Sequence, residues 1–191
     1  WAVNLEQAEA DGMAVRISLR EEDTELRESE GEIVFSRIIV VGVLVGVSAA
    51  LRQNTAWDYG TMGFAMLGVS IPNFVVAPVL ILAFAVYAGW LPAGGWDWSW
   101  QRMVLPMATL ALPVIAYIAR LTRGSMIEVL HSNYIRTARA KGLPERLVIW
   151  RHAFKPAILP VISYMGPATA ALITGSVVVE RIFSIPGLGS Y

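Results

Sequence analysis

The longest uncharged stretch constrains the fold more than any other feature of the sequence. Residues 61–90 are 30 consecutive positions without a charged side chain. As one straight helix, at about 1.5 Å per residue, they would measure about 45 Å, which exceeds the roughly 30 Å hydrocarbon core of a bilayer. Pro72 and Pro78 each remove a backbone donor and disturb the preceding helical turn. We therefore expect a membrane-crossing segment that is tilted or kinked at these prolines.

Three further apolar segments are long enough to cross a bilayer. They cover about residues 33–51, 103–119 and 157–179, and with 61–90 they predict four transmembrane helices. Of the 191 residues, 55% are hydrophobic and only 16% are charged, whereas roughly a quarter are charged in soluble domains. The expected fold is therefore an all-α, polytopic transmembrane helical bundle over residues 33–191.

The charges are separated along the chain, although the formal net charge is zero. Residues 1–32 hold ten acidic and three basic side chains, whereas residues 120–156 hold eight basic and two acidic ones. Because loops rich in Lys and Arg stay in the cytoplasm, 120–156 is predicted to be cytoplasmic, together with residues 52–60. Residues 91–102 and both chain ends are then external, and 1–32 is expected to be an acidic, poorly structured external segment.

Tryptophans are concentrated at the predicted external side. Four of the seven lie close together, at Trp90, Trp96, Trp98 and Trp100. Because indole rings prefer the headgroup level of a bilayer, this segment is expected along the outer membrane interface. Stacking on a ligand is the alternative.

A short basic helix is predicted within the cytoplasmic loop. Asn133 is a suitable helix N-cap, residues 134–141 contain no helix breaker, and Gly142 suits the left-handed position that follows a helix. Pro144 prevents continuation. Because helices shorter than roughly 12 residues rarely hold in isolation, this one must dock on another surface.

The spacing of this helix suggests which side docks. Thr137 and Ala138 share a face with Tyr134 and Lys141, and their small side chains would let another surface approach closely. Arg136 and Arg139 are expected together on an adjacent face.

The cytoplasmic loop also resembles a known family. Residues 134–143 read Tyr-Ile-Arg-Thr-Ala-Arg-Ala-Lys-Gly-Leu and 151–153 read Arg-His-Ala, a form similar to the loop of ABC-importer permease subunits. The similarity is greatest to the peptide and nickel branch, and within it to the B-type subunits of oligopeptide permeases. The general family pattern is Glu-Ala-Ala, three residues, Gly, nine residues, then Ile-x-Leu-Pro. Here Arg136-Thr137-Ala138 replaces Glu-Ala-Ala, Gly142 matches, and His152-Ala153-Phe154-Lys155 replaces the last element.

This resemblance implies a permease subunit of an ATP-driven importer, which translocates oligopeptides or dipeptides across the bacterial cytoplasmic (inner) membrane. Its implied partners are a homologous second permease subunit, two ABC ATPase subunits, an external or periplasmic solute-binding protein, and membrane lipid. Members of the family usually have six spans, so the chain is expected to be a fragment with four. The implied contacts with the ATPase subunits are Tyr134, Arg136, Thr137, Ala138, Arg139, Lys141 and Gly142.

A translocation path is expected along the prolines and small polar residues of the spans. The candidates are Pro72, Ser163, Thr169, Thr174 and Ser176. An uncharged wall with small polar groups would suit peptides of many sequences, but also nickel chelates, glutathione or another small solute. The alternative for the last span is a plain packing helix, because small residues also allow close helix contacts.

Several classes of function are disfavoured by the sequence. The chain contains no Gly-x-x-x-x-Gly-Lys-Ser/Thr loop, so it is not expected to be an enzyme, and ATP hydrolysis is expected on a partner subunit. No metal site and no cofactor are predicted, because there is no cysteine and the two histidines, His131 and His152, are far apart. Nucleic acid is not an expected partner of a basic loop flanked by spans. A structural or assembly membrane protein without transport activity remains the alternative.

Overall fold

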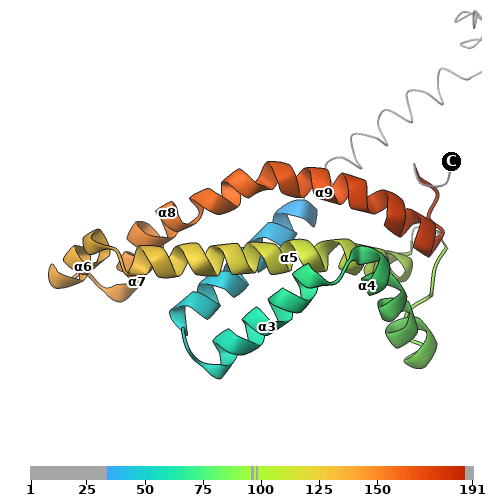
Figure 1. Ribbon diagram of the computed structural model, residues 1–191, viewed down its shortest axis with the longest axis horizontal. Coiled ribbons are helices and arrows are strands. Elements are labelled where there is room, and N and C mark those ends of the chain that lie inside the picture. The colour runs from blue at the N-terminus through green and yellow to red at the C-terminus, as the bar shows by residue number, and fades with distance from the viewer. Residues whose placement is uncertain (1–33, 96, 98, 188–191) are drawn as a thin grey trace, which may run out of the picture. The chain divides into compact units, whose positions relative to one another are not determined.

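The computed structural model describes residues 34–95, 97 and 99–187 (Figure 1). The acidic segment 1–32, Trp96 and Trp98 lie outside the described residues. The chain divides after Ile38 into two units, and the arrangement below is that of the second unit. Within the described residues every regular element is helical, and three helices and one bent helix pair are long and apolar enough to cross a membrane. The predicted all-α membrane fold is therefore confirmed.

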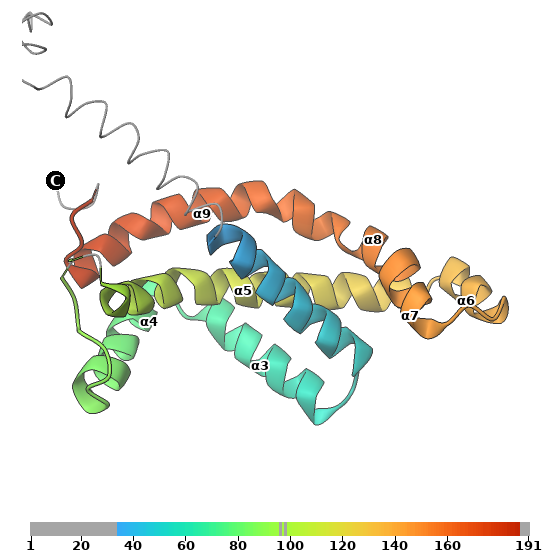
Figure 2. The same ribbon diagram turned by 180° about the vertical axis from the view of Figure 1, so that it is seen from behind.

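From residue 39 onward, the helix Val34–Leu51 crosses the longest helix of the chain, α5 (Trp100–Leu130), as the ribbons in Figure 2 show. Two glycines allow the close approach. A Cβ atom added to Gly42 would lie 2.8 Å from Ile118 Cγ2, and one added to Gly46 would lie 2.5 Å from the carbonyl oxygen of Ala119. Glycines four residues apart thus bring the two helix backbones together, as is common where lipid provides no hydrophobic drive for association.

The uncharged stretch 61–90 forms a bent pair instead of one rod. Helix α3 (Ala56–Ser70) is followed by α4 (Asn73–Leu80) and the π-helix η1 (Ile81–Tyr87), with a bend of 110° between the two parts. The bend lies at Ile71–Pro72, where both residues are extended. Pro78 lies inside α4 without breaking it. Of the two prolines at which the sequence predicts a kink, only Pro72 therefore marks the sharp turn.

Helix α5 is the element on which the others pack. It contacts α3, α4 and α9 (Leu159–Phe183), and it includes Pro106 and Pro113 without interruption. The predicted span 103–119 lies within it, but α5 continues to Leu130. Helix α9 contains most of the predicted span 157–179. In the most apolar 18 residues of α9, only 11% are buried within the chain, against 39% for the corresponding stretch of α5. Helix α9 therefore presents a broad apolar face outward.

A small core closes the end of the bundle opposite to α6. It consists of buried residues from α4, α5 and α9, namely Ala77, Leu105, Val179 and Phe183. The loop before α5 is attached to this core, because the backbone N–H of Gly95 donates to the carbonyl oxygen of Phe183 at 2.8 Å. Trp90 and Trp100, which flank this loop, are 74% and 68% exposed, which suits residues at a membrane interface.

Candidate functional site

The short helix α6 (Asn133–Ala140) lies beyond the C-terminal end of α5, at one extremity of the bundle (Figure 1). Only His131 and Ser132 separate the two helices. The predicted N-cap at Asn133 is wrong by one residue: Ser132 is the N-cap, and its hydroxyl donates to the carbonyl oxygen of Val129 instead of capping α6. Gly142 has a φ of +76°, so its predicted left-handed conformation is confirmed.

Helix α6 has one buried and one exposed face. Ile135 is 0% exposed and Ala138 is 8% exposed, and both lie on the side of α6 that docks on the chain itself. The other candidate residues of this helix and its C-terminal turn are exposed: Tyr134, Arg136, Thr137, Arg139, Lys141 and Gly142. The expected common surface of Thr137 and Ala138 is therefore not found. Alanine is small enough to pack against a partner or against the chain itself, and here Ala138 packs against the chain and holds α6 in place.

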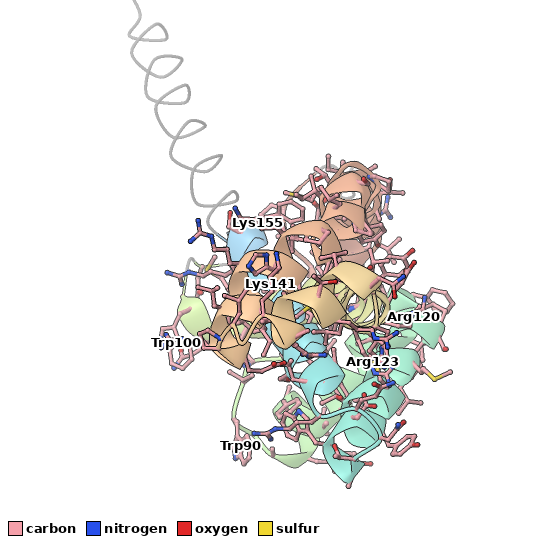
Figure 3. The ribbon with its side chains drawn as sticks, turned by 90° about the vertical axis from the view of Figure 1, so that its left-hand side faces the viewer. Trp90, Trp100, Arg120, Arg123, Lys141 and Lys155 are labelled. Carbon is pink, nitrogen blue, oxygen red and sulfur yellow. The ribbon has the colours of Figure 1, made fainter. Side chains whose placement is uncertain are left out.

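The support beneath α6 is a row of three short helical elements: α7 (Glu145–Leu147), η2 (Val148–Ala153) and α8 (Phe154–Ala157). Helix α6 packs on η2, and η2 and α8 pack on α5. In Figure 3, which views the molecule from this end, the labelled Lys141 and Lys155 lie on the elements nearest the viewer. The end of the molecule is thus one connected unit built on α5.

The π-helix η2 changes which residues of this support face inward. Val148 and Ala153, five residues apart, are both 0% exposed. A spacing of five on one face suits the wider π-turn, and an α-helix would separate them by about 140° at 100° per residue. Pro156 does not end this helical segment, although a proline often ends a helix. Pro156 lies in the first turn of α8, where the missing N–H has no required partner, and the break follows at Ile158.

An ion pair closes the turn after α6. Arg139 Nη2 donates to Glu145 Oε1 at 2.6 Å, and Arg139 Nε donates to Glu145 Oε2 at 3.1 Å. This hydrogen-bonded pair holds the pKa of the Glu145 carboxyl below its usual value and raises the pKa of Arg139. The end of α6 is thereby tied to the start of α7, and Arg139 is engaged within the chain although its side chain is exposed.

A second ion pair joins two distant parts of the chain at this end of α5. Arg123 Nε donates to Asp58 Oδ1 at 2.5 Å and Arg123 Nη2 donates to Asp58 Oδ2 at 2.6 Å. Asp58 is 0% exposed. Asp58 lies in the predicted polar turn 52–60, and sequence reasoning did not single it out. The available signal was weak: a carboxylate next to a long uncharged stretch needs a partner, but nothing local identifies which one.

The structure does not bring the candidate path residues together. Pro72 is at the bend, whereas the other four lie on α9, where each hydroxyl donates to a carbonyl oxygen of the same helix three or four residues earlier: Ser163, Thr169, Thr174 and Ser176. At about 100° per residue, Ser163 and Thr174 share one face, and Thr169 and Ser176 share another. They therefore border two different sides of α9.

A cavity of about 150 Å³ between α3, α4, α5 and α9 is lined by other residues. Asn73, Tyr117 and Tyr164 are the polar side chains in its lining, and the two tyrosine rings stack with their centroids 4.1 Å apart. In the described part of the chain, no three His, Asp or Glu residues are grouped so that they could hold a metal ion.

Comparison with known proteins gave concordant results. The family model described as "Binding-protein-dependent transport system inner membrane component" matches residues 42–191. The chain is 61% identical over 160 residues to the oligopeptide transport system permease protein OppB of Salmonella typhimurium and to that of Escherichia coli K12, which covers 83% of this chain and 52% of each relative. It is 51% identical over 153 residues to the dipeptide transport system permease protein DppB of Bacillus subtilis, covering 80% and 49%. The chain spans about half the length of the curated relatives it matches.

Proposed function

We propose, because the chain belongs to the family of binding-protein-dependent transport system inner membrane components, that it forms part of the permease subunit of an ATP-driven peptide importer. The proposed substrates are oligopeptides or dipeptides, since the relatives at 61% and 51% identity are named for their transport. The observation that carries the coupling part of the proposal is the exposed face of α6, which lies beyond the end of a membrane helix.

The dimensions of α5 support a position of α6 outside the bilayer. Its 31 residues measure about 46 Å at 1.5 Å per residue, which exceeds the hydrocarbon core by roughly 16 Å. With Trp100 at the outer interface, the excess length lies at the other end, near Arg120 and Arg123. Basic side chains are favoured at the cytoplasmic end of a span. Because helix α6 follows this end, we expect it to lie in the cytoplasm.

In the proposed mechanism, the exposed face of α6 binds in a groove of a separate ABC ATPase subunit, where ATP is hydrolysed. Tyr134, Arg136, Thr137 and Lys141 supply the contacts, and Ile135 and Ala138 hold α6 on its support so that the face is presented rigidly. Closure of the ATPase subunits then moves α6 and its support together with the end of α5. Rigid-body motion of this kind can open the path alternately to the two sides of the membrane.

The other proposed partners are a homologous second permease subunit, lipid and an external solute-binding protein, as the family membership suggests. The outward apolar face of α9 is available to a homologous second permease subunit and to lipid. An external solute-binding protein delivers the peptide, and the proposed path runs along the bend at Pro72 and the hydroxyl-bearing sides of α9. An uncharged path of this kind accepts peptides with different side chains, because it requires no complementary charge.

Cross-linking tests the coupling proposal. These 191 residues contain no cysteine, and any cysteine elsewhere in the full-length subunit is first replaced by serine. A single cysteine replaces Thr137, which is exposed, in the full-length subunit assembled with its ATPase, whose groove carries a second cysteine. We expect a disulfide whose yield changes with nucleotide. The matched control is Gln101→Cys, an exposed position at the opposite end of α5, and it should give none. Absence of a Thr137 cross-link in an assembled complex contradicts the coupling role and favours a structural protein.

Uptake competition tests the substrate class. Proteoliposomes that contain the complete transporter take up a labelled oligopeptide, and excess dipeptide, nickel chelate or glutathione is added. Competition by peptides alone is expected. Competition by nickel or glutathione, with none by peptides, would reassign the substrate while leaving the coupling proposal intact.

A further inference from the structure

The ion pair between the buried Asp58 and the partly exposed Arg123 connects α3 to the end of α5 that leads to α6. Its two hydrogen bonds are parallel, each guanidinium nitrogen binding a different carboxylate oxygen. A bidentate pair of this kind fixes both the distance and the orientation of its partners. Burying the Asp58 carboxylate is also costly, so stability alone gives little reason for a charged residue at this position.

The local backbone holds the Asp58 carboxylate in place for this pairing. Asn54 has a left-handed conformation, with φ of +61°, and its backbone N–H donates to Asp58 Oδ2 at 3.0 Å. Thr55 is the N-cap of α3, and its hydroxyl accepts a hydrogen bond from the backbone N–H of Asp58 at 3.4 Å. The Asp58 carboxylate is therefore held by its own loop independently of Arg123.

Further along α3, small residues contribute to its contact with α5. Ala65 of α3 is buried, and a Cβ atom added to Gly68 would lie 3.0 Å from the Cβ of Ala116 on α5. Small residues of this kind let two helices approach closely, but they provide no directional bond. Among the described residues of α3, only Asp58 forms an ion pair with α5. The pair is thus a directional connection between the two helices.

The position of Arg123 places this connection close to α6. Seven residues, or about 10 Å of helix, separate it from Leu130 at the end of α5. Because η2 and α8 pack on α5 as well, a displacement of α6 moves this end of α5 with it. At its other end, α3 leads into the 110° bend at Ile71–Pro72. A path for movement therefore runs from α6 through α5 and the ion pair to the bend.

We propose that Asp58 and Arg123 are positioning residues which make α3 move with α5 when α6 is displaced, so that ATPase closure reaches the bend at Ile71–Pro72. The proposal rests on the proposed coupling role of α6. Without the pair, α5 moves while α3 lags behind, and ATP is hydrolysed without a matching movement of peptide. Loss of the ion pair is therefore expected to uncouple ATP hydrolysis from peptide transport, while the transporter complex still assembles.

The experiment uses the complete transporter in proteoliposomes, with Asp58→Asn and Arg123→Gln as single variants and Asp58→Arg combined with Arg123→Asp as the reversed pair. Assembly, ATP hydrolysis and peptide transport are measured. We expect both single variants to assemble and hydrolyse ATP, with at least a tenfold fall in peptide transported per ATP, and the reversed pair to recover part of the loss. The control is Asp97→Asn, which removes the exposed pair with Arg102 at the other end of α5 and should leave the ratio unchanged.

The outcomes separate this proposal from the coupling role of α6. In the Asp58→Asn variant, the nucleotide-dependent cross-link at Thr137→Cys should persist. If the cross-link is absent in the protein that still has the ion pair, the coupling role of α6 is contradicted. An unchanged ratio of transport to ATP in assembled Asp58→Asn overturns the present proposal. If the single variants do not assemble, the neutral double variant Asp58→Asn with Arg123→Gln is measured. Full coupling in that variant, or failure of every variant to assemble, also overturns it.

Discussion

Replacing Gly46 by alanine provides a quantitative test of how the helix Val34–Leu51 packs on α5. The added Cβ would lie 2.5 Å from the carbonyl oxygen of Ala119 and 2.6 Å from Thr122 Cβ. Ordinary van der Waals contact begins at 3.4 Å, so the Ala119 carbonyl would have to retreat by 3.4 − 2.5 = 0.9 Å. That oxygen belongs to a helix backbone and cannot rotate away. The two helices must therefore separate.

The expected cost follows from two opposing effects. Overpacking of this kind costs typically 1–3 kcal/mol. Alanine also favours a helix over glycine by about 0.8–1.0 kcal/mol, which partly conceals the cost. Gly124, on α5, is the matched control, because a Cβ added there meets no atom within 4 Å. Gly124→Ala thus gains helix propensity without overpacking, whereas Gly46→Ala has both effects. The free energy of unfolding of Gly46→Ala should therefore be lower than that of Gly124→Ala by about 1–3 kcal/mol.

The measurement is reversible unfolding of the full-length subunit in mixed micelles, with increasing denaturing detergent and helicity followed by circular dichroism. We expect the midpoint of Gly46→Ala to lie below that of Gly124→Ala. Gly42→Ala should behave like Gly46→Ala, since its Cβ would lie 2.8 Å from Ile118 Cγ2 and 3.1 Å from the Ile115 carbonyl oxygen. Equal stability of Gly46→Ala and Gly124→Ala would refute the close crossing of these helices.

Three further predictions concern α6 and its turn. Ile135→Ala removes a fully buried side chain, at a typical cost of 2–5 kcal/mol, and should increase amide hydrogen exchange across α6, whereas Tyr134→Ala at an exposed position should not. Gly142→Val places a β-branched residue at a φ of +76°, and this variant should show faster exchange at the C-terminal end of α6 than Gly142→Asn. In a carboxyl NMR titration, Glu145 should show a pKa below its usual value, and Arg139→Gln should raise it. Because that pKa is lowered in the folded state, its contribution to stability is present above the ordinary glutamate pKa, about 4.3, and is lost as pH falls through the lowered value.

Local sequence patterns were sufficient wherever a property depends on neighbouring residues. The uncharged runs predicted a membrane helical bundle, because no other environment accepts so much apolar surface. The missing donor and fixed φ of proline predicted a kink at Pro72 or Pro78, of which the fold uses Pro72, and the left-handed Gly142 follows from the absence of a Cβ. The basic character of the segment around α6 predicts a cytoplasmic position, which stays a prediction. These properties require no knowledge of what lies across the bundle.

Tertiary structure decided the features that depend on distant residues. The sequence spacing was compatible with Ala138 facing a partner, but packing on the chain's own support turned it inward, because alanine fits either surface at little cost. The inward pair Val148 and Ala153 depends on a π-turn that a periodicity of 3.6 residues does not reveal. Asp58 and Arg123, 65 positions apart, carry no local sign of their pairing, since two charges meet only when the fold brings their helices together.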